Sequence, residues 1–203
     1  MQKVRDLFHR PPSQGFTLIE MAIVLVVIGL ILGMVFKGRQ LIASAKVKNA
    51  NAGYNKVIAG MNTFYDRYGF YPGDDCSAGA TEIDDCGPNF NGLIDDDSEG
   101  SAFFSLMVAK DILTKADTES ALGDAWNATG TDEDSWIYVE SADARIVCDL
   151  DRVADDGVSG AGDIRATDSG VSGSWTSVNS TYGNGDDCWD LTGTTGVQLK
   201  ILP

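Results

Sequence analysis

The strongest hydrophobic pattern in the chain lies near its start, where residues 16–36 read FTLIEMAIVLVVIGLILGMVF. Within this run, only Thr17 and Glu20 carry polar or charged side chains. A helix of this length, rising about 1.5 Å per residue, matches the roughly 30 Å hydrocarbon core of a bilayer. The pattern therefore predicts a membrane-spanning helix over residues 16–36.

After the apolar run, the hydrophobic positions take up a helical period. Over residues 37–68 they fall on one stripe at spacings of three and four, and the stripe consists of Tyr54, Val57, Ile58, Met61, Phe64 or Tyr65, and Tyr68. Gly69 and the sequence YPGD at 71–74 then form a cluster of helix breakers. The pattern predicts an amphipathic continuation of the helix over 37–68 and a separate globular head over 69–203.

Within the head, short helical and strand patterns alternate with turns rich in Gly, Ser, Thr and Asn. Helices are predicted at 101–113 and 145–157, and strands at 136–139, 163–166 and 196–201. This mixture indicates an α+β head built on the long N-terminal helix.

Charge divides the chain into two unlike parts. The 203 residues carry a net charge of -15, but residues 1–68 hold 9 basic and 3 acidic side chains, whereas residues 69–203 hold 6 basic and 27 acidic ones. Such an acidic head argues against nucleic acid as a partner, because binding to phosphates requires a cationic face.

Histidine usage excludes several kinds of enzyme. The chain has one histidine, His9, so no histidine follows the apolar run. Ser-His-Asp and Cys-His catalysis and His-ligated zinc are thereby excluded from the head. A hydrolase that uses paired carboxylates is the remaining enzymatic alternative, and no pair stands out among so many acids, so no catalytic residue is assigned.

The residues before the apolar run favour a cytoplasmic N-terminus. Lys3, Arg5 and Arg10 outnumber Asp6 there, although four basic residues also follow the run, at positions 37, 39, 46 and 48. Cleavage by a secretory signal peptidase near Ala43-Ser44-Ala45 is an alternative that would remove the anchor.

Glu20 distinguishes a generic anchor from a more specific one. A carboxylate at the centre of a membrane helix costs about 2.5–3.5 kcal/mol, and less near the interface, so such residues usually have a dedicated partner. The alternative is an interfacial glutamate whose carboxylate reaches water. Gly15 followed by FTLIE at 16–20 and a long apolar run resembles the class III signal of type IV prepilins and type II secretion pseudopilins.

The resemblance implies that a prepilin peptidase removes residues 1–15 by cutting between Gly15 and Phe16, and then methylates Phe16. It further implies that Glu20 is the assembly residue of a filament and that a small antiparallel sheet packs against the long helix. Cleavage creates a cationic amine at Phe16, about one helical turn from Glu20, so a neighbouring subunit's amine can pair with that carboxylate.

The four cysteines, Cys76, Cys86, Cys148 and Cys188, all follow the membrane segment, in a compartment expected to be oxidising. Three pairings are possible in principle. Proximity in the sequence favours Cys76–Cys86, which leaves Cys148–Cys188 to tie the C-terminal loop to a helix.

One acidic stretch partly matches a calcium-binding loop, with oxygen ligands around a tight glycine turn. The candidate ligands are Asn89, Asn91, Asp95, Asp97 and Glu99. Their spacing is not that of an EF-hand, and the stretch 184–190 is an alternative calcium site. A surface rich in aspartate at turns explains the same residues without any metal, so no cofactor is required.

These patterns together predict a structural subunit of a type IV pilus or a pilus-like filament. The expected partners are copies of the chain or other pilins, the prepilin peptidase and the assembly machinery of the inner membrane. We expect the chain in the bacterial inner membrane before assembly and in an extracellular or periplasmic filament afterwards. The alternatives are a pseudopilin of a type II secretion system and a calcium-dependent adhesive pilin at a filament tip.

Overall fold

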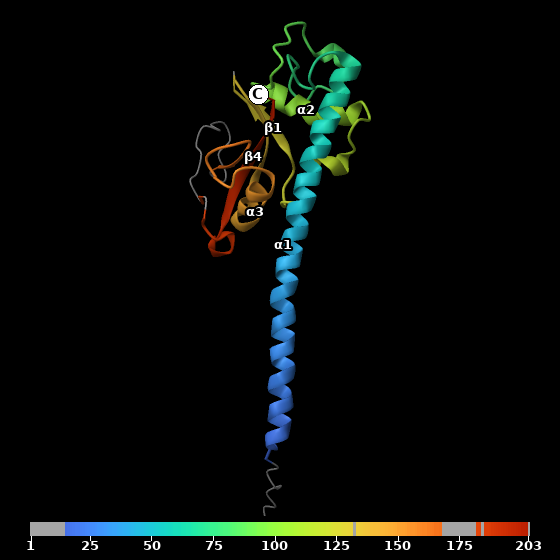
Figure 1. Cartoon of the computed structure of the whole chain (residues 1–203). Helices are drawn as coiled ribbons and strands as arrows, with labels where there is room; N and C mark the ends of the chain where they lie inside the picture. Colours follow the sequence, from blue (N-terminus) through green and yellow to red (C-terminus); the bar gives the residue numbers. More distant parts are fainter. Residues whose placement is uncertain (1–14, 132, 168–181, 184, 203) are drawn as a thin grey trace, which may run out of the picture. The chain divides into compact units, whose positions relative to one another are not determined.

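The computed structural model describes residues 15–131, 133–167, 182–183 and 185–202. Figure 1 shows the chain, whose elements in order are α1 (Leu18–Tyr68), η1 (Ile83–Asp85), α2 (Asp97–Ala109), η2 (Lys115–Thr118), β1 (Asn127–Gly130), β2 (Ser135–Asp143), α3 (Ala144–Ala154), β3 (Ile164–Thr167), η3 (Cys188–Asp190) and β4 (Thr194–Leu202). The helix α1 runs without a break through the predicted anchor and its amphipathic continuation.

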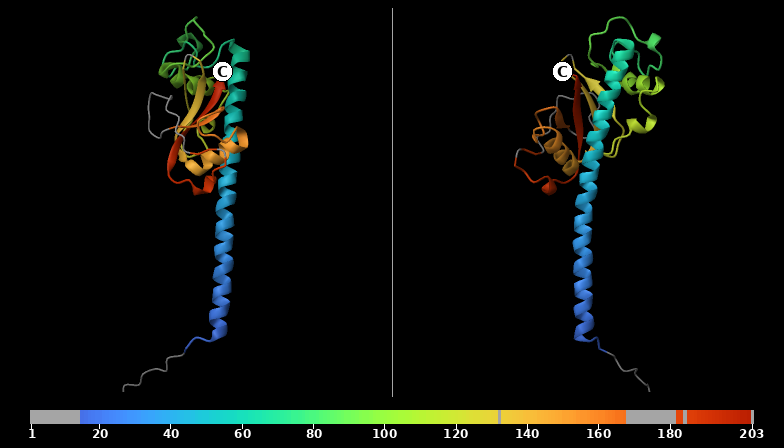
Figure 2. Two further views of the ribbon diagram at one scale, coloured as in Figure 1. Left: turned by 60° about the vertical axis from the view of Figure 1, so that its left-hand side comes forward. Right: turned by 45° about the vertical axis from the view of Figure 1, so that its right-hand side comes forward.

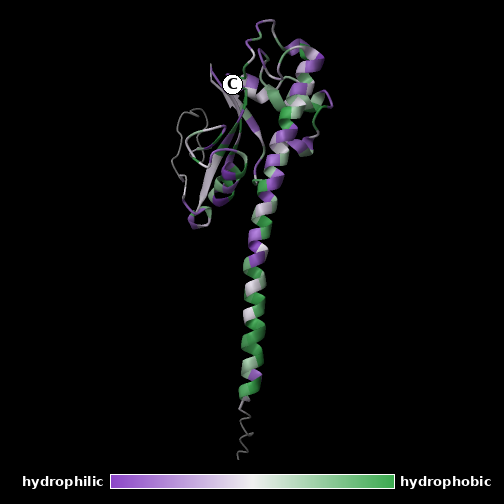
Figure 3. Cartoon of the chain, viewed as in Figure 1, coloured by the Kyte–Doolittle hydropathy of each residue, from purple (hydrophilic) through white to green (hydrophobic). Residues whose placement is uncertain are grey.

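The chain forms two compact units, which divide between Leu41 and Ile42. In the first unit, the apolar side chains of α1 are exposed, as Leu18 (93% exposed) illustrates. Figure 3 colours this part of the helix almost wholly hydrophobic. Within the described part of the chain, α1 is the one helix long and apolar enough to cross a membrane.

The second unit contains a four-stranded antiparallel sheet in the order β1-β2-β4-β3. Figure 2 shows these strands alongside the second half of α1 in both views. The α+β fold, with a long N-terminal helix and a small antiparallel sheet, is therefore confirmed.

The predicted apolar stripe of α1 provides its contact with the head. Val57, Met61 and Phe64 are buried there, whereas Tyr65 stays 44% exposed, so Phe64 is the core residue of the stripe. The Tyr54 hydroxyl donates a hydrogen bond of 2.5 Å to the carbonyl oxygen of Lys200, which ties the helix to β4.

The helix α2 begins and ends four residues earlier than the predicted helix at 101–113. It starts early because Asp96 caps its first turn, accepting a hydrogen bond of 2.8 Å from the Glu99 amide. Gly100 permits close packing on β1, since a Cβ atom there would lie 2.2 Å from the Ala128 carbonyl oxygen.

The helix α3 stops three residues short of the predicted end at 157. Asp155 and Asp156 instead form a turn with Gly157, which has a φ of 74° that favours glycine. The disulfide Cys148–Cys188 joins α3 to η3, and the disulfide Cys76–Cys86 closes the loop that follows α1.

Three of the four strands overlap the predicted ones. The strands β2 and β4 extend the predictions at 136–139 and 196–201 by one to four residues at each end, and β3 is shifted by one residue from the prediction at 163–166. The strand β1, with the sequence NATG, was not predicted, because asparagine and glycine have low strand propensity and the segment has only four residues.

Candidate functional site

Thr17 and Glu20 form a capping box at the start of α1. The Thr17 backbone N–H and side-chain hydroxyl each donate a hydrogen bond of 2.8 Å to the same oxygen of Glu20. In return, the Glu20 amide donates to the Thr17 hydroxyl oxygen at 3.3 Å. Reciprocal bonds of this kind satisfy amides that otherwise lack a partner in the first turn of a helix.

The predicted cleavage junction lies immediately before this cap. Gly15, Phe16 and Thr17 have no helical structure, and Phe16 is 83% exposed. A Cβ atom at Gly15 would meet nothing within 4 Å, so packing within the chain does not demand glycine there. Among the described residues, packing therefore gives no reason for glycine at position 15.

In the head, the buried carboxylate of Asp74 organises the loop that contains the predicted calcium ligands. Asp74 is 1% exposed, and its two oxygens accept hydrogen bonds from the amides of Asn91 (3.1 Å) and Gly92 (2.9 Å). Burial raises the pKa of the Asp74 carboxyl, and the two amides oppose this shift. Asp74 therefore acts as a fixed acceptor that holds residues 91–92.

Glu99 serves the same purpose from α2. Its two oxygens accept hydrogen bonds from the amides of Asp75 (2.7 Å) and Asp95 (2.9 Å), and the residue is 7% exposed. Burial raises the pKa of the Glu99 carboxyl, and the bonds from these two amides work against the rise. Glu99 thus joins two separate segments of the loop through their backbone.

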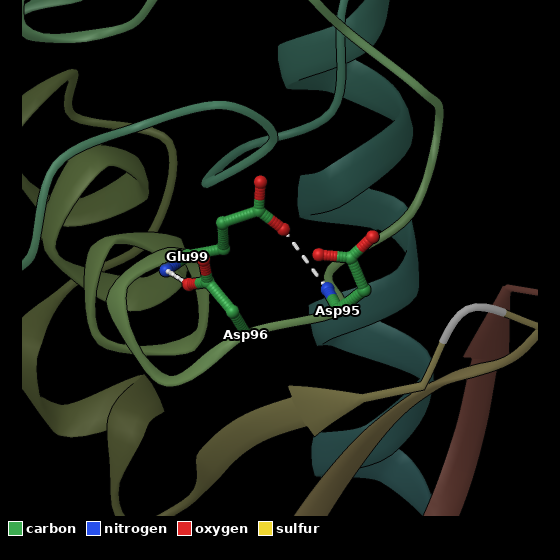
Figure 4. A group of neighbouring side chains, drawn as sticks. All are labelled: Asp95, Asp96 and Glu99. Atoms are coloured by element: carbon green, nitrogen blue, oxygen red, sulfur yellow. Dashed lines mark hydrogen bonds between the residues drawn. The ribbon is translucent and has the colours of Figure 1, made fainter.

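Asp95, Asp96 and Glu99 form a compact group of three carboxylates, each offering an oxygen within 4.8 Å of the others. Figure 4 shows the carboxylates of Asp95 and Glu99 turned toward the same space, with Asp96 bonded to the Glu99 amide. The oxygens suit a hard cation such as calcium. Four of the six already accept a hydrogen bond within the loop.

The other predicted calcium ligands lie outside this carboxylate group. Asn91 contacts it through a hydrogen bond of 2.6 Å from its side-chain amide to Asp95. Asn89 instead donates its backbone N–H to Asp75, and the Asp97 side chain is exposed on the first turn of α2. Of the five predicted ligands, the structure therefore brings together Asp95 and Glu99, and it adds Asp96.

A second carboxylate group, Asp151, Asp155 and Asp156, lies at the end of α3. Asp151 is fully buried and accepts hydrogen bonds of 2.9 Å from the Gly157 amide and the Tyr182 hydroxyl. Burial raises the pKa of the Asp151 carboxyl. This group orders the turn after α3, as Asp74 and Glu99 order the loop before α2.

In the alternative calcium stretch, residue 184 lies outside the described residues. Asp186 accepts a hydrogen bond from the Gly183 amide, and Asp187 caps η3 by accepting one from the Trp189 amide. These two aspartates therefore stabilise local turns.

Sequence reasoning missed two features of these sites. The Thr17–Glu20 capping box could have been read from the spacing T-x-x-E before an apolar run. The role of Asp74 had no sequence signal, because its bonds reach Asn91 and Gly92, 17 and 18 residues away.

Comparison with known proteins bears on the N-terminal site. A family model described as the prokaryotic N-terminal methylation motif matches residues 10–36. The matched segment contains Gly15, Phe16, Glu20 and the apolar run, and it confirms the resemblance to the class III signal of type IV pilins and pseudopilins. No curated protein matches the chain. The motif implies processing by a prepilin peptidase and association with the membrane.

Proposed function

We propose that this chain, which carries the prepilin-type methylation motif, is a structural subunit of a type IV pilus or a pilus-like filament. The single observation that supports this function most is the match at residues 10–36. Copies would assemble through α1 after cleavage between Gly15 and Phe16. A separate assembly machinery in the inner membrane would supply the energy.

The geometry at Glu20 supports an assembly role. Cleavage after Gly15 leaves a positive amine on Phe16, next to the capped first turn of α1. The Glu20 carboxylate already accepts two hydrogen bonds from Thr17 within its own chain. A neighbouring subunit's amine would neutralise the negative charge that remains in the apolar surroundings.

Two substitutions separate this assembly role from helix capping. Glu20→Gln keeps a side-chain acceptor for the cap but removes the charge, whereas Glu20→Ala removes both. We expect both variants to insert into the membrane and both to reduce sheared filaments about tenfold or more. Thr17→Ala is the matched control, since it removes the capping hydroxyl and keeps the charge of Glu20, and it should assemble.

The readouts are the amount of processed protein in the membrane by immunoblot and the filament yield after shearing. Wild-type filament yield from Glu20→Gln would mean that Glu20 serves only the helix cap. If Thr17→Ala lost assembly to the same extent, the helix cap and not the charge of Glu20 would be what assembly requires.

A pseudopilin of a type II secretion system is the alternative within the same motif class. It would form a short periplasmic filament, and its loss would stop protein secretion without removing surface pili. Deletion of the gene followed by assays for secretion and for surface filaments separates the two roles. A tip protein would instead be scarce in sheared filaments that other pilins dominate.

Calcium binding by the head is a second proposal, and the observation that favours it is the group of Asp95, Asp96 and Glu99. Millimolar calcium should raise the melting temperature of the disulfide-bonded chain. The shift should disappear in Asp95→Ala and persist in Asp97→Ala, whose exposed side chain lies outside the group. The absence of any shift in the wild type would remove this proposal.

A further inference from the structure

Asn91 and Gly92 form an Asn-Gly pair in the loop between η1 and α2. Asn91 is exposed, and Gly92 is partly exposed. In such a pair, the backbone nitrogen of the glycine can attack the side-chain amide of the asparagine, because glycine has no Cβ atom to hinder the approach. In this loop, hydrogen bonds hold the atoms that the attack requires.

The nucleophile would be the Gly92 backbone nitrogen, and its proton already has an acceptor. The Gly92 N–H donates a hydrogen bond of 2.9 Å to Oδ2 of Asp74. Asp74 is 1% exposed, and its other oxygen accepts a hydrogen bond of 3.1 Å from the Asn91 backbone N–H. A carboxylate held in this way is placed to act as the general base for the Gly92 proton.

The electrophile would be Cγ of Asn91, and its carbonyl oxygen also has a partner. Oδ1 of Asn91 accepts a hydrogen bond of 2.9 Å from the Leu93 backbone N–H. The attack builds negative charge on this oxygen, and a fixed N–H donor stabilises such charge. Because the same bond closes a turn across Gly92, it holds the Asn91 side chain against the nitrogen that would attack it.

The nitrogen that would leave is fixed as well. Nδ2 of Asn91 donates a hydrogen bond of 2.6 Å to Oδ2 of Asp95. With Leu93 on one side and Asp95 on the other, the side-chain amide of Asn91 is bonded at both of its polar atoms. The side chain therefore loses little further freedom when it reacts.

Gly92 leaves the reacting atoms open to water. Its φ of 85° belongs to the left-handed region that favours glycine. A Cβ atom at this position would meet nothing within 4 Å, so no other part of the described chain covers that side of the residue. Water can therefore reach a product formed between Asn91 and Gly92.

We propose that Asn91–Gly92 is a self-modification site, at which the folded head converts Asn91 to aspartate or isoaspartate. The Gly92 nitrogen forms a bond to Cγ of Asn91 while its proton passes to Asp74. The bond from Cγ to Nδ2 breaks, the proton returns through solvent, and the nitrogen leaves as ammonia, which closes a succinimide ring. Water then adds to one of the two ring carbonyls and opens the ring, so water is the only other reactant.

The competing outcome is that the same hydrogen bonds lock the pair and protect it. Bonds that exist only before the reaction raise its barrier, whereas bonds that become stronger in the transition state lower it. Asp74 accepts the proton that must leave Gly92, and the Leu93 N–H faces the oxygen that gains charge. Both bonds therefore strengthen during the attack, and the geometry favours reaction.

The modification would change the charge of the loop at a defined place. A carboxylate at position 91 has no N–H to donate, so the hydrogen bond to Asp95 would be replaced by repulsion between like charges. The new charge would lie beside the group of Asp95, Asp96 and Glu99. This inference does not depend on the filament function proposed above.

Peptide mass spectrometry of the full-length, detergent-solubilised chain tests the proposal. The chain is incubated at neutral pH in water enriched in heavy oxygen, so that a residue hydrolysed during the incubation carries the label. A second sample is denatured and reduced before the same incubation. We expect Asn91 to convert about tenfold faster in the folded chain than in the denatured one. An equal or slower rate in the folded chain would overturn the proposal.

Two variants test the role of Asp74. Asp74→Asn removes the base and should slow the conversion of Asn91 in the folded chain about tenfold or more. Asp151→Asn is the matched control, because Asp151 is also buried and also accepts two hydrogen bonds, but outside this loop, and it should keep the wild-type rate. Circular dichroism checks that both variants are folded.

The outcome with Asp74→Asn is decisive if the variant folds, since a wild-type rate would mean that Asp74 is not the base. If it does not fold, the comparison of the folded and denatured wild-type chains decides alone. The products give an independent readout. A succinimide opens at either carbonyl, so both aspartate and isoaspartate should appear at position 91, whereas aspartate alone would mean direct hydrolysis by water without attack by Gly92.

Discussion

At the scale of single residues, buried carboxylates in this head act mainly as acceptors for backbone amides. Asp74, Glu99 and Asp151 each accept two hydrogen bonds, and all three are less than 10% exposed. Their partners are backbone amides, apart from the Tyr182 hydroxyl. The many acidic residues suggest metal binding when only the sequence is considered. In the fold, these three instead stabilise the backbone of the head.

Glu99→Gln should destabilise the head. Both oxygens of Glu99 accept from backbone amides, and a glutamine offers one oxygen and one NH₂ group, so one buried donor loses its partner. We expect a loss of about 1–3 kcal/mol in the free energy of unfolding, measured by denaturant titration of the detergent-solubilised chain. Asp97→Asn, at an exposed position of the same helix, should change stability by less than about 0.5 kcal/mol.

The same buried acids predict the effect of pH. Burial raises the pKa of Asp74, Glu99 and Asp151 above their unfolded values of 3.8, 4.5 and 3.8. Their contribution to stability is complete below those values and is lost as pH rises through the higher folded pKa. We therefore expect the melting temperature to rise as pH falls from 7 toward these unfolded values, and a fall over that range would contradict these shifts.

Further acidification should reverse this gain. The hydrogen bond from Lys56, followed by those from Thr114, lowers the pKa of Asp117 from 3.8 to about 2. A lowered pKa contributes stability above the unfolded value, and this contribution is lost as pH falls from about 4 to about 2. The ion pair between α1 and η2, 2.6 Å long, is thus a part of the head that strong acid weakens.

At the scale of elements, the periodicity of hydrophobic residues predicted the helices α1, α2 and α3 and three of the four strands. It did not predict most of their first and last residues. The end of α1 was predicted correctly at Tyr68, because Gly69 follows it with a φ of 84°. The start of α2 depended on Asp96 as a cap, and Asp96 was one of several neighbouring aspartates that could have capped the helix. β1 escaped prediction because its pairing with β2, not its own sequence, makes it a strand.

The two disulfides should differ in their effect on stability. Cys148 and Cys188 are 40 residues apart, whereas Cys76 and Cys86 are 10 apart. The chain-entropy model predicts a larger effect for the longer loop, by about 1 kcal/mol. The double variant Cys148→Ala/Cys188→Ala should therefore melt at a lower temperature than Cys76→Ala/Cys86→Ala, as measured by thermal denaturation of both proteins in one buffer. The opposite order would contradict the model.

The candidate sites were predicted unevenly for a similar reason. Gly15, Phe16 and Glu20 lie within six consecutive residues, so a local sequence motif is enough to predict the N-terminal site. The carboxylates of the head are arranged by contacts between distant segments, such as the bond of Glu99 to Asp75, 24 residues away. Such contacts are visible only in the folded chain.

At the scale of the whole molecule, the charges are divided between a basic stem and an acidic head. Residues 69–203 carry 27 acidic and 6 basic side chains, and three of those six are in ion pairs within the head. Between Glu20 and Asp66, every charged residue of α1 is basic. Segments of opposite charge attract one another, so this division would favour association between copies of the chain.

The central claim is that the chain is cut after Gly15 and then assembled as a filament subunit. Mass spectrometry of the N-terminal peptide from sheared, purified filaments tests it most directly. We predict a peptide that begins at Phe16 and carries one methyl group on its amine. Filaments without this chain, or a mature N-terminus at Met1 or just after Ala45, would contradict the claim.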